Sequence, residues 1–374
     1  MKFIYLANYR LPTELAHGLQ VMQMCEALAA IGAQVVLLVP RRINKNKAEP
    51  FAYYGVEKKF KIIRIPCIDL LFLGGTKVTF FLQTLTFLIS AKLFLLFYSH
   101  DVIYTREQLV GRFFKKFNLE LHSLPHQISN WQKKIWRRAD HLIVLTSFIK
   151  NRLVELGVTA DRILVAPDGV NLVKFDLDLD LVSARQELGL PTGKKLIGYV
   201  GMLRTLGMTK GIDDAVAALA NLPIDVILVL VGGYPEDIDY YKKLAGELGV
   251  TERIIFTGRV AHNLIPKYLK AMDILLAPFP ETEHYKYYMS PLKIFEYMAS
   301  DRPIITTDLP TIREILNDSN AKIIMPENNE ELARAVAELL EDNNLANQLA
   351  DQAKNDVQEY TWEKRAARII NFVK

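Results

Sequence analysis

The feature that most constrains the fold is a regular alternation of short, strongly apolar runs with longer helical patterns. Runs built almost only from Val, Ile and Leu are typical of parallel strands that helices cover on both faces. Two successive series of such runs therefore predict two doubly wound α/β domains. The predicted strands are 3–7, 34–39, 61–65, 101–105, 141–146 and 163–167, followed by 196–201, 226–232, 253–258, 274–278, 303–307 and 321–325.

The length of the chain also favours two domains. Its 374 residues, of which 50% are hydrophobic, exceed one ordinary core and suit two Rossmann-like domains of ~150–200 residues each. We expect an N-terminal domain over 1–168, a linker over 169–190 and a C-terminal domain over 191–358. Residues 359–374 are expected to form a closing helix that packs back toward the N-terminal domain.

Metal-binding patterns are weak in this sequence. Asp176, Asp178 and Asp180 have the spacing of a metal-binding DxD, but we interpret them as a solvated linker of alternating charge. Cys25 and Cys67 form neither a disulfide framework nor a metal site, which favours a reducing cytosol. The opening MKFIYLANYR is interpreted as a first strand and not as a signal peptide. We therefore expect no metal and no cofactor.

Positive charge is concentrated in the first half of the chain. Residues 1–165 hold 23 Lys and Arg against 11 Asp and Glu, a formal charge of +12, and the remainder holds 23 against 31, or −8. Such a surface suggests an anionic partner. No nucleic-acid motif is recognisable, and an anionic membrane face fits as well. The apolar stretch 70–97 is interpreted as a core helix, with a helix resting partly on a bilayer as the alternative.

The loop VGMLRTLGMTKG directly follows a predicted strand and combines turn-forming glycines with two cations. Arg204 can grip a diphosphate bidentately, and Lys210 can meet it as a point charge. The spacing matches neither a P-loop nor a dinucleotide fingerprint. Its glycines are Gly201, Gly207 and Gly211.

A second candidate is the segment MSPLKIFEYMAS. Ser290 is expected to cap a helix and Pro291 to take its first position. The N–H groups of Leu292 and Lys293 would then be free to hold a phosphate. Glu296 lies four residues after Leu292 on the same face, where its carboxylate can accept hydrogen bonds from a ribose diol.

Two further segments belong to the first half of the chain. His122 should lie at the end of a strand, although a lone histidine is more often structural, and His126 is a weaker candidate. The first strand-to-helix connection, residues 8–22, contains Pro12, His17 and Gly18, which we expect near a ligand, with an ordinary connector as the alternative.

Together these pieces resemble the retaining glycosyltransferases of family 4, also called glycosyl transferases group 1. The most specific matches are VGMLRTLGMTKG, PLKIFEYMASDRP and the ELH at 120–122, and VAPDGVNLVKF and AMDILLAP add to them. The resemblance covers nearly the whole chain. It implies a GT-B fold, in which two Rossmann-like domains face each other across a cleft. It also implies a UDP- or GDP-sugar donor held by the C-terminal domain and an acceptor held by the N-terminal domain.

The resemblance implies roles for individual residues. Arg204 and Lys210 match the phosphate-binding pair that stabilises the leaving diphosphate, and His122 matches an active-site histidine near the sugar. Glu296 matches the second glutamate of the E-x7-E motif. The implied catalytic residues are His122, Arg204 and Lys210, the implied donor-binding residues are Gly201, Arg204, Lys210, Arg259, Val260, Ser290, Pro291, Leu292, Lys293 and Glu296, and the acceptor-binding candidates are Pro12, His17 and Gly18.

Two positions depart from the family pattern. Tyr288 stands where the first glutamate of E-x7-E is expected, and Asp301 replaces a usual glycine. The sugar hydroxyls would then be met by backbone or by Lys293.

The leading expectation is a metal-independent, retaining hexosyltransferase acting on a glycan or lipid-linked acceptor, in cell-surface polysaccharide or glycolipid assembly. Its expected location is the cytoplasm, with a peripheral position on the inner membrane face. The alternatives are a sugar-nucleotide epimerase of similar shape and a catalytically inactive nucleotide-binding scaffold.

Overall fold

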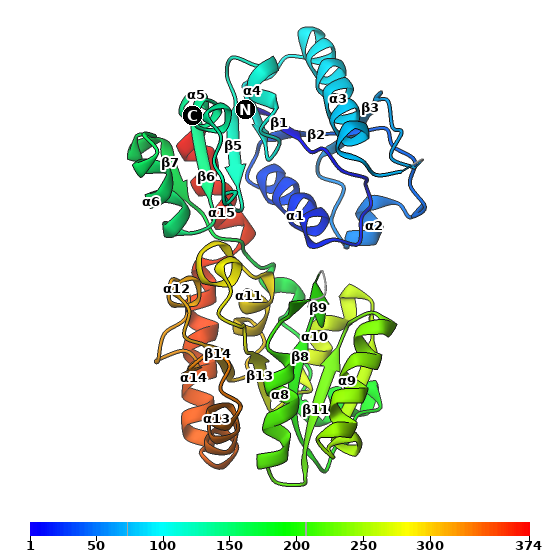
Figure 1. Ribbon diagram of the computed structural model, residues 1–374, viewed down its shortest axis with the longest axis vertical. Coiled ribbons are helices and arrows are strands. Elements are labelled where there is room, and N and C mark those ends of the chain that lie inside the picture. The colour runs from blue at the N-terminus through cyan, green and yellow to red at the C-terminus, as the bar shows by residue number, and fades with distance from the viewer. Residues whose placement is uncertain (73, 206–207) are drawn as a thin grey trace. The chain divides into compact units, whose positions relative to one another are not determined.

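The computed structural model describes residues 1–72, 74–205 and 208–374, and the chain divides into two compact units (Figure 1). The first unit comprises Met1–Asp168 and Trp362–Lys374, and the second comprises Gly169–Thr361. The chain therefore passes between the units twice. Each unit is built on one parallel sheet, so the predicted α/β class with two doubly wound domains is confirmed.

The first unit contains a seven-stranded sheet in the order β3-β2-β1-β4-β5-β6-β7, and every neighbouring pair is parallel. The order reverses beside β1, and ligands of such sheets bind at this reversal, beyond the carboxyl ends of the strands. The strands are β1 Lys2–Leu6, β2 Gln34–Pro40, β3 Lys61–Ile65, β4 Val102–Thr105, β5 Asn118–Leu121, β6 His141–Val144 and β7 Ile163–Val165.

Helices connect these strands, and several begin at the capping signals that the sequence supplies. Thr76, Ser129 and Thr146 each accept a hydrogen bond from a first-turn N–H of the helix that follows. The last helix, α15, belongs to this unit and packs beside α1. The helices are α1 Ala16–Ala30, α2 Pro50–Tyr54, α3 Lys77–Phe97, α4 Val110–Phe113, α5 Asn130–Arg138, α6 Ser147–Glu155 and α15 Trp362–Val373.

The second unit contains a six-stranded parallel sheet in the order β12-β11-β8-β13-β14-β15. Alternate residues of one strand enter different cores: Ile227 and Val229 pack on one face, Leu228 and Leu230 on the other. This period of two, with both sets buried, explains why the strands are apolar throughout. The strands are β8 Lys195–Val200, β11 Val226–Val231, β12 Ile254–Gly258, β13 Ile274–Ala277, β14 Ile304–Thr307 and β15 Lys322–Ile324.

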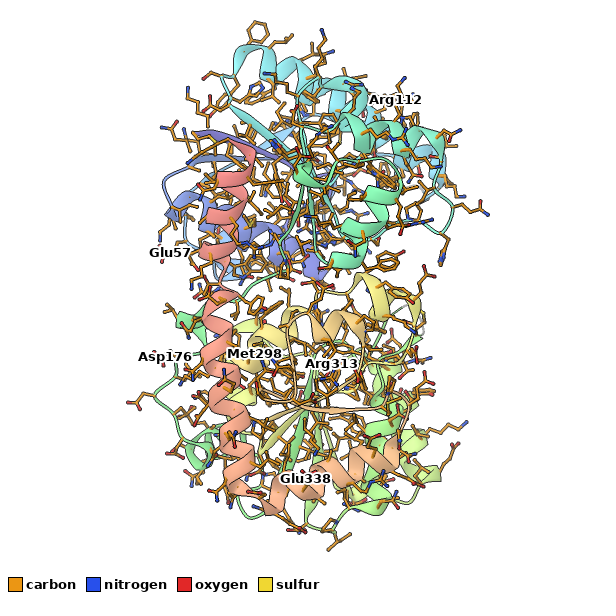
Figure 2. All side chains as sticks on the ribbon, turned by 90° about the vertical axis from the view of Figure 1, so that its left-hand side faces the viewer. Glu57, Arg112, Asp176, Met298, Arg313 and Glu338 are labelled. Carbon is orange, nitrogen blue, oxygen red and sulfur yellow. The ribbon has the colours of Figure 1, made fainter. Side chains whose placement is uncertain are left out.

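The helices of the second unit pack into two cores, one on each face of its sheet, and Met298 of α11, labelled in Figure 2, is buried in one of them. These helices are α7 Leu181–Leu188, α8 Ile212–Ala218, α9 Pro235–Glu247, α10 Ile265–Lys270, α11 Leu292–Met298, α12 Pro310–Arg313, α13 Asn329–Glu341 and α14 Asn343–Asp356, with a π-helix at His284–Tyr288.

The expected linker, 169–190, is part of the second unit. Val170, Phe175 and Ala184 are buried in its core, and Asp180 caps α7 by accepting a hydrogen bond from the Ser183 N–H at 2.9 Å. Asp176 is exposed at the surface (Figure 2). The alternation of aspartate and leucine here places the charges outward and the leucines half-buried.

Candidate functional site

In the second unit, glycines bring the backbone close together at the carboxyl ends of β8 and β11. Gly201 has φ 137°, which a residue with a side chain rarely adopts, and a Cβ there would lie 3.1 Å from Lys293 Nζ. Gly232 has φ 118°, and a Cβ on it would lie 2.2 Å from the Gly201 carbonyl oxygen. The predicted donor residue Gly201 thus lies against Lys293, at the edge of the sheet where ligands bind.

Arg204 and Lys210 are brought together by an antiparallel hairpin that the sequence did not predict. Its strands are β9, Arg204–Thr205, and β10, Met208–Thr209, and Arg204 pairs with Thr209. Lys210 directly follows Thr209, so the two cations lie at the open end of the hairpin. Gly207 lies outside the described residues.

The guanidinium of Arg204 is supported from α9. It stacks over the Tyr240 ring at 4.2 Å, and the Tyr240 hydroxyl donates to Asp213 Oδ1 at 2.9 Å. Thr209 also bonds to Asp213. Asp213 therefore connects the hairpin to the helix that begins after it.

Lys293 lies in a buried environment lined by aromatic rings. Its ammonium nitrogen is buried, makes no hydrogen bond within the described residues, and lies 3.5 Å from the centroid of the Tyr199 ring. Burial, together with the charge of Lys210, holds the pKa of Lys293 well below its usual value. Burial also lowers the pKa of Lys210. These two poorly solvated amino groups lie near each other, and a bound anion would stabilise their charged forms.

Glu296 lies on the same helix, and its side chain is only 17% exposed. Its Oε1 atom is 3.9 Å from Nε2 of His262. Burial raises the pKa of Glu296, while His262 and Lys293 act in the opposite direction. Arg259 stacks over Tyr234 at 5.2 Å, and Val260 packs against the core.

The predicted start of this helix is wrong by one position. Pro291, with φ −80° and ψ 118°, has extended backbone and occupies the N-cap position, so α11 begins at Leu292. Ser290 is therefore not the cap. The residue before a helix keeps extended angles, and a proline whose ψ is extended cannot belong to the first turn.

The two departures from the family pattern have definite surroundings. Tyr288 ends the π-helix, and its hydroxyl lies 3.5 Å from Glu283 Oε1. Asp301 has φ 57°, a left-handed conformation in which glycine is easier. Its carboxylate forms ion pairs with Lys270 and Lys354.

In the first unit, His122 follows β5 as predicted and belongs to a buried network of charges. His122 Nε2 lies 2.6 Å from Glu120 Oε1. The same oxygen accepts from Arg106 at 3.0 Å and from Arg365 at 2.9 Å, while Tyr104 donates to Oε2 at 2.5 Å. Burial alone would raise the pKa of Glu120, but the two guanidiniums hold it well below its usual value.

The acceptor candidates lie around the start of α1. The His17 ring contacts that of Tyr9 at 4.7 Å, and burial with the nearby charges of Arg106 and His122 lowers its pKa to about 4. A Cβ on Gly18 would lie 2.3 Å from the Tyr54 hydroxyl, so this position has no space for a side chain. Pro12 follows a cis peptide bond, and its carbonyl accepts from Asn44.

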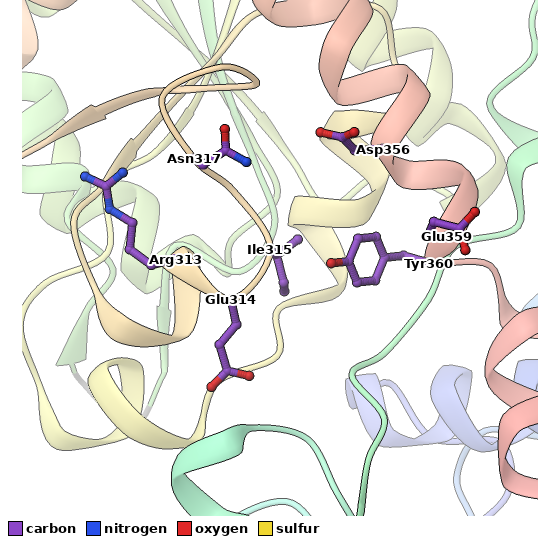
Figure 3. Close-up of a pocket in the computed structure, with 7 residues that line it drawn as sticks. All are labelled: Arg313, Glu314, Ile315, Asn317, Asp356, Glu359 and Tyr360. Carbon is purple, nitrogen blue, oxygen red and sulfur yellow. The ribbon is translucent and has the colours of Figure 1, made fainter.

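Figure 3 shows a separate pocket in the second unit, formed near α12 and the end of α14. None of the predicted site residues lines it. We therefore assign the candidate site to the strand ends. The pocket is lined by Arg313, Glu314, Ile315, Asn317, Asp356, Glu359 and Tyr360.

Sequence reasoning missed the residues that surround His122. Arg106 directly follows the buried strand β4, and the rule that ligands bind beyond the carboxyl ends of parallel strands could have identified it. Arg365 lies in the apolar stripe of its helix, between Trp362 and Ile369, and a charge at such a position indicates a buried partner. Gln20 and Asp168, joined by a hydrogen bond of 2.5 Å, carry no comparable signal.

Comparison with known proteins identifies the chain. The profile described as Glycosyltransferase Family 4 matches residues 18–174, and the one described as Glycosyl transferases group 1 matches residues 183–356. An uncharacterised glycosyltransferase of Methanocaldococcus jannaschii is 26% identical over 240 residues, covering 62% of this chain and 59% of that relative. The match therefore spans about three fifths of the curated relative's length.

Solved structures agree in fold. A sucrose-phosphate synthase from Thermosynechococcus elongatus has a TM-score of 0.77 at 22% identity, covering 99% of this chain and 98% of the other. HepE of Anabaena in complex with UDP-glucose has a TM-score of 0.74 at 16% identity and covers 99% of both chains. The chain belongs to the family 4 glycosyltransferases and has the GT-B fold.

Proposed function

We propose that this protein transfers a sugar from a nucleoside diphosphate sugar, bound by the second unit, to a hydroxyl group of a glycan or lipid-linked acceptor, bound by the first. The observation that carries the proposal is the buried Lys293 amino group, which has no hydrogen-bond partner within the described residues and lies near Lys210. A diphosphate would supply the missing negative charge. The solved HepE complex contains UDP-glucose, which supports a nucleotide sugar as the donor class.

The proposed chemistry retains the configuration at the anomeric carbon. The bond from that carbon to the diphosphate oxygen breaks, and the acceptor oxygen bonds to the same face of the carbon. The acceptor proton passes to the departing diphosphate oxygen. Arg204, Lys210 and Lys293 would stabilise the charge that develops on the leaving group, so three protein cations act where charge changes most. We propose that this reaction needs no metal.

Glu296 would hold the ribose of the donor. Its raised pKa reflects a carboxyl group taken from water, which favours a site where hydroxyl groups donate to it. Arg259 and Val260 would lie against the base. Tyr288 cannot accept hydrogen bonds from sugar hydroxyls as a carboxylate does, so we propose that Lys293 also meets the sugar.

We further propose a peripheral position on an anionic membrane. One helix within the described residues, α3, is long and apolar enough to span a membrane by length and composition, with 33% of its most apolar window buried. Its inner face is tied to the unit through Gln83 and Thr84, which bond to Asn8 at 2.9 and 2.8 Å. Its outer face exposes large apolar side chains, which include Val78, Phe81, Ile89, Leu93, Leu96 and Phe97.

Basic residues belong to the same unit as this apolar face. Lys92 lies within the outer face itself, which disfavours a span and favours a helix lying in the interface. Helix α4 contacts α3 and carries Arg112 at its end (Figure 2). The neighbouring α5 presents Lys133, Lys134 and Arg137, and its Arg138 donates to the Phe114 carbonyl. An apolar face and basic side chains on one unit fit anionic lipid.

The first experiment is calorimetric titration of the protein with UDP, GDP, ADP and TDP, repeated on Arg204→Ala. Micromolar binding of one nucleotide that the substitution weakens would support the proposal and identify the donor class. No binding by folded protein would contradict it and favour an inactive scaffold. Conversion of a bound nucleotide sugar to an isomer without an acceptor would instead indicate an epimerase.

A further inference from the structure

We propose that Glu120, clamped by Arg106 and Arg365, fixes the His122 ring so that Nε2 carries its proton and Nδ1 accepts a hydrogen bond from a sugar hydroxyl. The proposal rests on the glycosyl transfer proposed above and assigns positioning roles to Glu120 and Arg365. It also gives the C-terminal helix a part in the site.

The tautomer follows from the contact between His122 and Glu120. The two atoms, Nε2 and Oε1, are 2.6 Å apart. An ionised carboxylate can only accept hydrogen bonds, so Nε2 must be the donor. In a neutral imidazole the other nitrogen, Nδ1, then has a lone pair and no proton.

The charges facing His122 favour the neutral ring. The carboxylate of Glu120 is already matched by two guanidiniums, those of Arg106 and Arg365. The other titratable groups that face the ring are Asp168 and, on α1, His17, whose lowered pKa of about 4 leaves it neutral at pH 7. Burial and the charge of Arg106 lower the pKa of His122, against the opposing effect of Glu120. A third positive charge would therefore be poorly compensated.

The carboxylate that orients the ring is itself held on every side. Its side chain is 0% exposed, Oε1 accepts from both guanidiniums and Oε2 from the Tyr104 hydroxyl. Arg106 is braced in turn, because its Nη1 donates to Gln20 Oε1 at 3.1 Å. Glu120 therefore cannot rotate without breaking several buried hydrogen bonds, and the ring that it holds keeps one orientation.

Arg365 links this network to the C-terminal helix. Its Nε donates to the carbonyls of Ala166 and Pro167 at 3.3 and 2.9 Å, and its Nη2 donates to Glu120. A lysine could not form these bonds together, because it lacks the planar fork of donors. The helix α15 is thus part of the support of His122, not only a closing element.

The accepting atom remains available. His122 Nδ1 makes no hydrogen bond within the described part of the chain, and the side chain is 27% exposed. A neutral Nδ1 in this position can accept from a hydroxyl group of a bound sugar. It is a directional acceptor, held in place before the sugar arrives.

The first test measures the tautomer and needs no substrate. Full-length protein labelled with 15N-histidine would be examined by long-range 1H–15N correlation, with His122→Asn identifying the His122 signals. We expect a neutral ring protonated at Nε2 at pH 7, and a mixture of tautomers in Arg365→Lys. A ring protonated at Nδ1, or at both nitrogens, would overturn the proposal. If the spectrum of folded Arg365→Lys is unchanged, Arg365 does not position His122 and has a structural role only.

The second test compares two amides at position 122. An asparagine places its amide where Nδ1 lies, and a glutamine places its amide where Nε2 lies. With UDP-, GDP-, ADP- and TDP-glucose as donors, we expect His122→Gln to lower kcat about tenfold more than His122→Asn, the value of one hydrogen bond. Equal losses would overturn the role of Nδ1. Nucleotide affinity should be unchanged in both.

The two proposals can fail separately. If no donor is turned over or bound by wild-type protein, the proposed glycosyl transfer fails. The tautomer and its dependence on Arg365 are still decided by the spectra.

Discussion

At the scale of single residues, Lys293 distinguishes a binding function from a structural one. A buried amino group with no hydrogen-bond partner within the described residues costs stability, so we expect Lys293→Met to leave Tm unchanged or raise it. The same change should weaken binding of the diphosphate by about 1.5–3 kcal/mol, or roughly 10- to 150-fold. Thermal unfolding and calorimetry on the same samples check both effects. A large fall in Tm would show that Lys293 serves the core.

The lowered pKa of Lys293 adds a pH effect whose sign can be derived. Burial and Lys210 favour the neutral amine in the empty site, and a bound diphosphate would favour the charged form and raise the pKa. Binding should therefore take up protons and weaken as pH rises above the pKa of the empty site. Calorimetry in buffers of different ionisation enthalpy measures this uptake. Lys293→Met should reduce it, whereas identical uptake in the variant would assign the proton elsewhere.

Arg204 and Lys210 should affect turnover more than folding. Each would act on charge that develops in the transition state, and losing one such donor typically costs about 2.7–4 kcal/mol, or 10²–10³ in kcat. We expect Arg204→Ala and Lys210→Ala to show this loss with little change in Tm, because both lie at the open end of the β9–β10 hairpin. Parallel losses of kcat and Tm in either variant would count against a catalytic role.

At the scale of elements, the two faces of α3 have different roles: the inner face packs on the first unit, and we propose that the outer face docks on lipid. Replacing Phe81 and Leu96 by serine removes apolar groups from the outer face, each worth about 1.5–3 kcal/mol if buried in lipid. We expect this double variant to bind anionic vesicles at least tenfold more weakly in sedimentation assays. The matched control replaces Ile224 and Met325, which are exposed in the second unit. Equal binding of both variants would exclude α3 as the docking surface.

The elements also show how far the sequence alone could lead. Apolar strands such as Val226–Val231 were predictable, because a short run that is apolar on both faces is typical of a parallel strand covered by helices on both sides. The short strands β9 and β10 were not, because two residues carry no period. The start of α11 was predicted one residue too early because Ser-Pro is compatible with two alignments: serine at the N-cap with proline in the first turn, or proline at the N-cap. Only the ψ angle of Pro291 distinguishes them. The network around Glu120 joins residues up to 245 positions apart, and such pairs leave no local pattern.

At the scale of the whole molecule, the uneven charge matters more than the net charge of +4. The first half of the chain carries +12, and the basic helix α5 adjoins the apolar helix α3 through α4. If the net charge alone drew the protein to an anionic membrane, the loss of any lysine would weaken membrane binding equally. If the first unit makes the contact, only the loss of lysines in that unit would weaken membrane binding, since screened charges act over ~8–10 Å.

Two charge reversals of equal size test this difference. Lys133→Glu with Lys134→Glu changes α5, and Lys242→Glu with Lys243→Glu changes the exposed face of α9 in the second unit, so both variants end at the same net charge. We expect only the α5 variant to lose binding to anionic vesicles at low salt, by about 1 kcal/mol for each lysine removed and more for reversal. Wild-type binding should fall as salt rises and be absent with neutral lipid. Equal losses in the two variants would show that net charge alone draws the protein to the membrane, and an α5 variant that binds as wild type does would place the docking surface elsewhere.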